Sequence, residues 1–120
     1  MALATLLLQP NPPTTILIDE PELGLHPFAI GKLAALLQKV AVRSQVIIST
    51  QSVELLNYFE PEDVIVVEQE APVPGNDRQR GLPSPRQSVF RRLEPAELSR
   101  WLEKYSLGDL WKKNVLGGRP

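Results

Sequence analysis

The sequence contains no cysteine and a single histidine, His26. The missing cysteines exclude a disulfide framework, a thiol nucleophile and a cysteine-ligated zinc site. One imidazole cannot build a histidine-rich metal site, so we expect His26 to serve in a loop or a chain-to-chain contact. An excess of one charge is also absent, because 13 basic and 14 acidic residues leave a net charge of −1. The overall charge therefore gives no attraction to nucleic acid or to an anionic membrane.

Long hydrophobic runs are absent as well. The apolar opening MALATLLL has eight residues and is soon followed by Pro10, whereas a membrane-spanning helix needs about 20 apolar residues. The opening also lacks the basic start of a secretory signal peptide. We therefore expect a cytoplasmic protein with no membrane partner. The length of 120 residues allows one domain with one core.

Two kinds of apolar segment alternate over the first 70 residues. Runs of β-branched and apolar residues without polar alternation are typical of strands buried on both faces, as in a parallel sheet. Such runs occur at residues 14–19, 46–48 and 63–68. Helical spacing of apolar residues predicts helices at residues 1–9, 27–42 and 53–59. Pro27 suits the first turn of the second helix, and Ser52 suits the N-cap of the third. The alternation predicts an α/β fold with a parallel sheet and flanking helices.

The rest of the chain has a different composition. Residues 71–87 contain four Pro, two Gly and three Arg with almost nothing to bury, which predicts a flexible surface loop. Residues 88–93 resume strand character and are expected to form a hairpin with residues 63–68. Pro95 then opens a final helix. The core of this C-terminal part is expected to include Trp101, Tyr105 and Trp111.

Two adjacent carboxylates, Asp19 and Glu20, stand at the C-terminal end of the first predicted strand. Ligands bind at this edge of the sheet in open α/β folds. One carboxylate can serve Mg²⁺, directly or through water. The other can orient or deprotonate a water molecule for attack on a phosphoryl group. The second predicted strand also ends in small hydroxyl residues, within residues 49–52.

Simpler interpretations of the charged residues stay open. Asp19 and Glu20 could belong to a solvated acidic turn. Together with Glu22 they could instead form the metal cluster of a nuclease, although no third distant carboxylate or lysine pattern supports a nuclease. Five arginines could form a phosphate-binding patch: Arg78, Arg80, Arg86, Arg91 and Arg92. A solvated loop is the favoured interpretation of these arginines, because stacking aromatic residues are missing apart from Phe90.

The acidic stretch resembles a known family. Residues 16–27, ILIDEPELGLHP, are similar to the Walker B and D-loop segment of ABC-type P-loop ATPases. The closest group is the RecF/SMC-like ATPases that are often labelled AAA-type in bacterial genomes. Residues 47–52, IISTQS, resemble the switch strand of these proteins, which usually reads IISTHS. Residues 105–118 resemble the C-terminus of one bacterial branch.

The resemblance implies a role for five residues. Asp19 would organise Mg²⁺ with the nucleotide, and Glu20 would be the general base that positions the attacking water, so both would contact Mg-ATP. Gly24 and His26 lie in the loop that would meet a second ATPase domain. Gln51 stands where the family usually has a histidine that senses the γ-phosphate. Glutamine can donate a hydrogen bond but cannot carry charge or shuttle a proton.

Two family motifs are absent from this sequence. A P-loop reads G-x-x-x-x-G-K-[ST], because its backbone N–H groups and lysine hold the phosphates. The only Gly-Lys pair, Gly31-Lys32, is followed by Leu33 and lies inside a predicted helix. The ABC signature, LSGG-like, is missing too. A complete nucleotide-driven motor domain also usually exceeds roughly 200 residues.

We therefore expect residues 1–120 to form a single partial ATPase domain that starts inside the helix after the signature. Its fold would be part of an ABC-like P-loop NTPase sheet, with a C-terminal hairpin and helix. Its partners would be ATP and either a missing N-terminal half or a homodimer mate, whereas DNA is possible but unsupported by net charge. The chain alone is expected to be inactive. The alternative is a non-catalytic remnant that acts as an interaction module through its sheet edge or residues 23–27.

Overall fold

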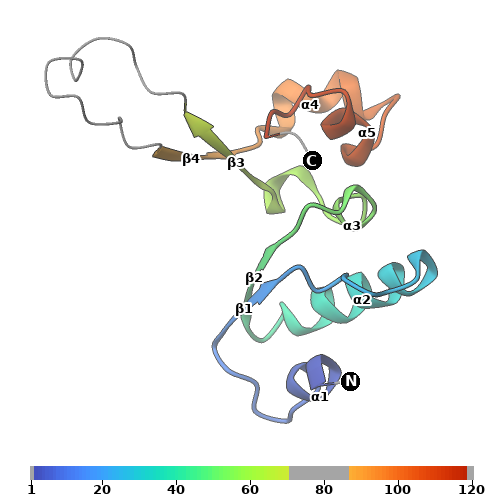
Figure 1. Ribbon diagram of the computed structural model, residues 1–120, viewed down its shortest axis with the longest axis vertical. Coiled ribbons are helices and arrows are strands. Elements are labelled where there is room, and N and C mark those ends of the chain that lie inside the picture. The colour runs from blue at the N-terminus through green and yellow to red at the C-terminus, as the bar shows by residue number, and fades with distance from the viewer. Residues whose placement is uncertain (1, 71–86, 119–120) are drawn as a thin grey trace, which may run out of the picture. The chain divides into compact units, whose positions relative to one another are not determined.

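The computed structural model describes residues 2–70 and 87–118 (Figure 1). The chain divides into two compact units, Met1–Tyr58 and Phe59–Pro120. Among the described residues, no helix has the length and apolar character needed to cross a bilayer. The prediction of one partial domain over the whole chain stays a prediction, and the two units are considered one at a time.

The first unit alternates helices and strands as its apolar pattern predicts. In chain order, its elements are α1 (Ala2–Leu7), β1 (Thr15–Asp19), α2 (Pro27–Val40), β2 (Gln45–Ser49) and α3 (Val53–Leu56). The two strands pair in parallel, from Thr15 opposite Gln45 to Asp19 opposite Ser49. This register confirms the predicted strand–helix–strand unit and brings the carboxyl ends of both strands to the same edge.

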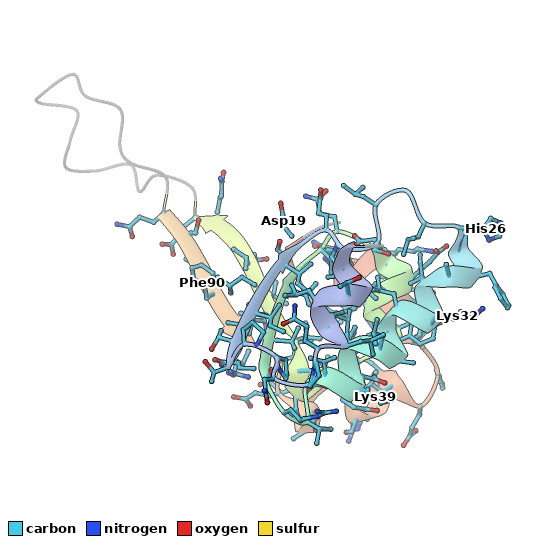
Figure 2. All side chains as sticks on the ribbon, turned by 90° about the horizontal axis from the view of Figure 1, so that it is seen from below. Asp19, His26, Lys32, Lys39 and Phe90 are labelled. Carbon is cyan, nitrogen blue, oxygen red and sulfur yellow. The ribbon has the colours of Figure 1, made fainter. Side chains whose placement is uncertain are left out.

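The core of the first unit is built around α2. Its buried residues recur at helical spacing: Ile30, Leu33, Ala34, Leu37 and Val40. Leu7, Ile16 and Leu55 are buried as well and extend this core to the neighbouring elements. Residues on the opposite side of α2, including Lys32 and Lys39, point outward (Figure 2). The helix is therefore amphipathic, and its apolar stripe is the main packing surface of the unit.

The prediction that both faces of the strands are buried is wrong. Ile16 is 5% exposed, but its neighbour Leu17 is 75% exposed and its partner Ile47 on β2 is 49% exposed. Successive side chains of a strand point to opposite faces of the sheet. The face of Ile16 is covered, whereas the face that carries Leu17 and Ile47 is largely exposed. The apolar composition is therefore typical of an interior sheet, but this structure buries only one side.

The second unit contains an antiparallel hairpin followed by helices. Its elements are the 3₁₀ turn η1 (Pro61–Asp63), β3 (Ile65–Glu70), β4 (Gln87–Arg92), α4 (Pro95–Leu102) and α5 (Leu107–Lys112). The hairpin pairs Ile65 with Arg92 and Glu70 with Gln87 at its two ends, which confirms the predicted hairpin. Val66 and Leu93 are buried, as are four leucines of the helical part: Leu98, Leu107, Leu110 and Leu116.

Three predictions for the second unit need correction. The sequence pattern places the strand at 63–68 in the parallel sheet, but among the residues that the structure describes β3 pairs with β4 alone, because an apolar run fits either kind of sheet. The single final helix is two helices, since Ser106 caps α5 in a capping box with Asp109. Trp101 is not in the core: it is 46% exposed and lies beside the ring of Tyr105. Of the predicted loop 71–87, Gln87 opens β4 and residues 71–86 lie outside the described residues.

Candidate functional site

The carboxyl ends of β1 and β2 bring the predicted acidic pair beside a hydroxyl residue. Asp19 lies opposite Ser49 in the parallel register. The Ser49 hydroxyl donates a hydrogen bond to Asp19 Oδ1. The next residue continues the pairing, because the backbone N–H of Glu20 donates to the carbonyl oxygen of Ser49 at 2.8 Å. The strand end thus orients the Asp19 carboxylate through one of its oxygens and leaves Oδ2 without a partner among the described residues.

The chain reverses directly after Asp19 through an unusual backbone conformation. Glu20 has φ of +46°, a left-handed value that is uncommon for residues other than glycine. The turn is closed by Leu23 N–H, which donates to the Glu20 carbonyl at 3.2 Å, and by Leu25 N–H, which donates to the Glu22 carbonyl at 3.0 Å. Gly24 has φ of +77°, where the absence of a Cβ permits the bend. A strained non-glycine residue at a strand end is a common feature of functional sites.

Because Glu20 has a left-handed backbone conformation, we expect the glycine variant at this position to be more stable than the alanine variant. This is the reverse of the usual order within a helix. A left-handed conformation costs an L-residue about 1–2 kcal/mol, so Glu20→Gly is expected to be about 1 kcal/mol more stable than Glu20→Ala in urea denaturation. Exposed Glu54 in the first turn of α3 is the matched control. Glycine there is expected to be less stable than alanine by about 0.5–1 kcal/mol. If the alanine variant were more stable than the glycine variant at both positions, backbone strain at Glu20 would be contradicted.

Glu22 is held by a second hydroxyl from the segment after β2. The Thr50 hydroxyl donates to Glu22 Oε1, and the same hydroxyl oxygen accepts a hydrogen bond from Ser52 N–H at 3.0 Å. Glu22 Oε2 is buried and has no hydrogen-bond partner among the described residues. The sequence pattern indicates hydroxyl residues at this strand end but does not indicate that they pair with carboxylates. The parallel register of β1 and β2 is the signal from which the hydrogen bond between Ser49 and Asp19 could have been predicted.

Of the three carboxylates in the acidic turn, that of Glu20 accepts no hydrogen bond from any described residue. Asp19 and Glu22 each accept a hydroxyl hydrogen bond, whereas the half-buried Glu20 side chain contacts no donor among the described residues. A carboxylate without an internal donor keeps its oxygen lone pairs available for water. The arrangement therefore suits one carboxylate that is oriented and a neighbouring one that is available to accept a proton.

The donor set of the acidic turn can hold a divalent cation such as Mg²⁺ only weakly by itself. No cluster of three or more carboxylate or histidine side chains that could hold a metal occurs among the described residues, so the nuclease-type cluster of Asp19, Glu20 and Glu22 is not formed. Mg²⁺ is commonly bound by one or two carboxylates together with water and substrate phosphates. The carboxylate of Asp19 can supply one such ligand.

The remaining predicted site residues are distributed around this turn. Gln51 is exposed and lies between Thr50 and Ser52, in the segment that contacts Glu22. His26 is also exposed and caps α2, because its Nδ1 accepts a hydrogen bond from Phe28 N–H at 3.2 Å. Figure 2 shows His26 at the start of α2, well away from Asp19. The expected contact roles of Gly24 and His26 stay predictions.

The Gly31-Lys32 pair has a structural role inside α2. A Cβ on Gly31 would lie 2.9 Å from the Tyr58 hydroxyl oxygen, so the small residue allows the tyrosine to approach the helix. The Lys32 ammonium lies over the Phe28 ring, 5.3 Å from its centroid. Both residues are thus used in local packing, in agreement with the prediction that this pair is not a P-loop.

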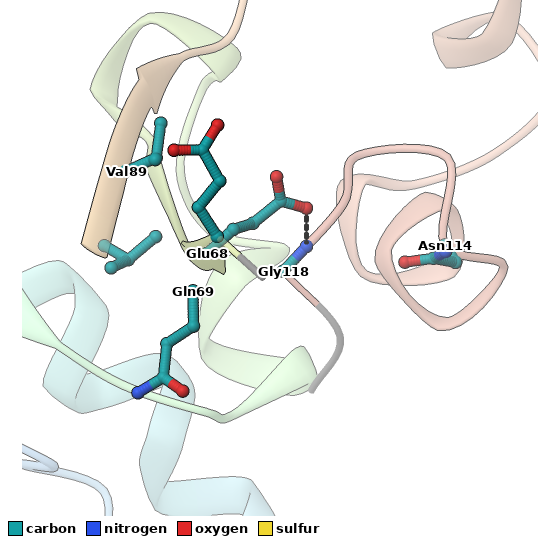
Figure 3. A pocket seen from close by; sticks show the side chains of 7 residues that line it. Glu68, Gln69, Val89, Asn114 and Gly118 are labelled. Atoms are coloured by element: carbon teal, nitrogen blue, oxygen red, sulfur yellow. Dashed lines mark hydrogen bonds between the residues drawn. The ribbon is translucent and has the colours of Figure 1, made fainter. Parts of the chain in front are cut away.

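A shallow depression in the second unit lies apart from the predicted site residues. It has a volume of about 650 Å³, is lined by residues of the hairpin with Asn114 and Gly118, and belongs to the second unit. Figure 3 shows Gly118 there, hydrogen-bonded through its N–H to Glu68 at 2.6 Å. None of the predicted site residues lines this depression.

Comparison with known proteins identifies the segment that contains this site. Residues 1–57 match the model of a family described as "AAA domain, putative AbiEii toxin, Type IV TA system". The match supports an AAA-type P-loop ATPase family. The AAA match includes the acidic turn and Gln51 and ends at Asn57, close to the end of the first unit. The observed parallel α/β unit is compatible with a partial P-loop NTPase fold. No match was found among curated proteins.

Proposed function

We propose that the acidic turn is the Walker B half of an ATP-hydrolysing site in a cytoplasmic, RecF/SMC-like ATPase of the ABC type. Asp19 is the carboxylate for Mg²⁺, and Glu20 is the general base. Gln51 is the switch residue, and the loop with Gly24 and His26 faces a second ATPase domain. The observation that supports this proposal is the Glu20 carboxylate, which has no donor within the described part of the chain, whereas Asp19 and Glu22 on either side each have one.

The chemistry assigned to these residues follows from their different surroundings. When bound, Mg²⁺ neutralises charge on the phosphate oxygens of ATP. Asp19, oriented through Oδ1 by Ser49, offers its other oxygen to that ion or to its hydration water. Glu20 accepts a hydrogen bond from the attacking water and takes up its proton as the water oxygen bonds to the γ-phosphorus. The bond from that phosphorus to the β–γ bridging oxygen breaks in the same step, and ADP leaves. Gln51 can donate its amide hydrogens to a phosphate oxygen but cannot relay a proton.

The phosphate cradle is assigned to residues outside this sequence. The 120 residues contain no P-loop or signature. In P-loop proteins, the backbone N–H groups of the P-loop supply most of the binding to the phosphates. We propose that an N-terminal half supplies them, and that the complete domain pairs with a homodimer mate. Mg-ATP is then expected to bind the chain alone with a dissociation constant weaker than 1 mM, roughly.

Isothermal titration calorimetry with Mg-ATP tests whether the groups that bind the phosphates lie outside this chain. The full 120-residue chain is expected to give no measurable saturation, since one free carboxylate next to an oriented one does not hold a triphosphate. Joining the chain to a segment with a P-loop and signature is expected to restore micromolar binding. Micromolar affinity of the chain alone would contradict the assignment of the cradle to another segment.

A second candidate is a non-catalytic interaction module. It is favoured by exposed apolar side chains around the loop, because Leu23 is 71% and Phe28 76% exposed. The outer sheet face with Leu17 and Ile47 adds to them. This candidate predicts that a complete protein carrying the chain hydrolyses no ATP, and that Glu20→Gln alters nothing. Measurable hydrolysis that depends on Glu20 would exclude it.

A further inference from the structure

Three of the four residues that follow the last apolar position of β2 carry hydroxyl groups, and each hydroxyl has a separate structural partner. Ser49 donates to Asp19, and Thr50 donates to Glu22. Ser52 instead accepts a hydrogen bond from Leu55 N–H at 3.1 Å and thereby caps α3. Thr50 is the one with two partners in different segments, because it also accepts from Ser52 N–H.

The two hydrogen bonds of Thr50 form a directed chain. A hydroxyl has a single proton and can accept with its lone pairs. The Thr50 proton goes to Glu22, which as a carboxylate can only accept, and the Thr50 oxygen receives the Ser52 N–H. Valine has the same shape as threonine but would lose both bonds, whereas serine would keep both. The position therefore depends on a hydroxyl group and not on side-chain volume alone.

Glu20 lies between the two carboxylates that residues 49 and 50 hold. On one side Ser49 binds Asp19 and, through its carbonyl, Glu20 N–H. On the other side Thr50 binds Glu22. A left-handed non-glycine residue persists only where its surroundings determine its conformation. The bond from Thr50 closes the turn on the C-terminal side of Glu20.

We propose that Thr50 is a positioning residue that holds the acidic turn in the conformation in which Glu20 acts. Through Ser52 N–H it also ties this turn to the segment that carries Gln51, so the base and the switch residue are held in one hydrogen-bonded unit. Thr50 contacts neither nucleotide nor metal in this role. The inference rests on the proposed function, because it assigns Thr50 to the orientation of the proposed base.

Amide hydrogen exchange of the full chain, measured by NMR, tests the positioning role. Thr50→Val is expected to raise the exchange rates of the Leu23 and Ser52 amides about 5- to 10-fold, the size expected for the loss of one internal hydrogen bond. Thr50→Ser is expected to restore wild-type rates. Thr15→Val, at an exposed threonine of β1, is the matched control and should leave both amides unchanged. Equal rates in Thr50→Val and the wild type would overturn the proposal.

A second variant keeps the test decisive if Thr50→Val destabilises the whole unit, which faster exchange of the Leu37 amide in α2 would reveal. Glu22→Ala removes the same bond from the other side, so its effect on the Leu23 amide should not add to that of Thr50→Val. Additive effects would overturn the proposal.

Paramagnetic broadening by Mn²⁺ separates this inference from the proposed function. In the wild type, Mn²⁺ alone is expected to broaden the Glu20 amide before those of α2, and Thr50→Val should reduce this broadening at least 2-fold while Thr50→Ser retains it. Absence of broadening in the wild type would count against Asp19 as the metal carboxylate, and the exchange data would still decide the role of Thr50. Broadening equal in the wild type and Thr50→Val would overturn the positioning role while leaving the metal assignment in place.

Discussion

Glu20→Gln is expected to lower the rate of ATP hydrolysis by a complete ATPase containing this chain about 100- to 10,000-fold, the range of positioned general bases. Glutamine keeps the length and shape of the side chain but cannot accept a proton from water. The Glu20 carboxylate has no donor among the described residues, so the substitution breaks no hydrogen bond to a described residue. Nucleotide binding is therefore expected to stay within about 2-fold of the wild type, because binding depends on the P-loop.

The measurement is steady-state phosphate release together with nucleotide binding by calorimetry. Glu54→Gln is the matched control, since Glu54 is exposed on α3 and removes the same charge outside the acidic turn. It is expected to retain wild-type rates. Hydrolysis that is unchanged in Glu20→Gln would refute the assignment of the base, and a loss of nucleotide affinity would show that Glu20 serves binding instead.

Gly118→Ala is expected to destabilise the chain by about 2–5 kcal/mol, the largest single effect on folding that we predict. Gly118 has φ of +59°, and a Cβ there would lie 2.7 Å from Val66 Cγ1 and 3.0 Å from the Val67 carbonyl oxygen. Left-handed backbone costs an L-residue about 1–2 kcal/mol, and overpacking against a buried valine adds about 1–3 kcal/mol. Movement of the chain would also strain the bonds of Gly118 to Glu68 and Trp111.

Gly24→Ala separates the backbone cost from the packing cost. Gly24 has φ of +77°, but a Cβ there would meet nothing within 4 Å. Its replacement is expected to cost about 1 kcal/mol, from backbone strain alone. Urea denaturation followed by far-UV circular dichroism measures both variants. Similar losses at the two glycines would show that the close approach of Gly118 to Val66 is relieved at little cost.

The acidic pair was predictable because its signal is local. An apolar β-branched run predicts a strand, and Asp19 and Glu20 follow it directly, so their position at a strand end needs no long-range information. The parallel pairing of β1 with β2 was also predictable, since a helix of 14 residues separates the strands and suits a crossover connection. Together, these two features place the carboxyl ends of β1 and β2, where the candidate site lies, at the same edge of the sheet.

The hydroxyl partners of the carboxylates were not predictable in the same way. Asp19 meets Ser49, and Glu22 meets Thr50, only in the observed register. A shift of one residue would move every side chain to the opposite face of the sheet. The sequence predicted the hairpin of β3 with β4, but composition did not reveal that β3 lies outside the parallel sheet of β1 and β2, because the same valine-rich run fits either environment.

The sequence by itself determined the elements of the first unit, the pair Asp19 and Glu20, and the absence of a P-loop within these 120 residues. These depend on residues close together in the chain. Tertiary structure alone decided that Ser49 and Thr50 hold two of three carboxylates. It also decided that Glu20 adopts a left-handed conformation and has no donor from residues 2–70 or 87–118. The physical reason is that hydrogen bonds between residues about 30 positions apart depend on strand register, which forms only when the sheet packs.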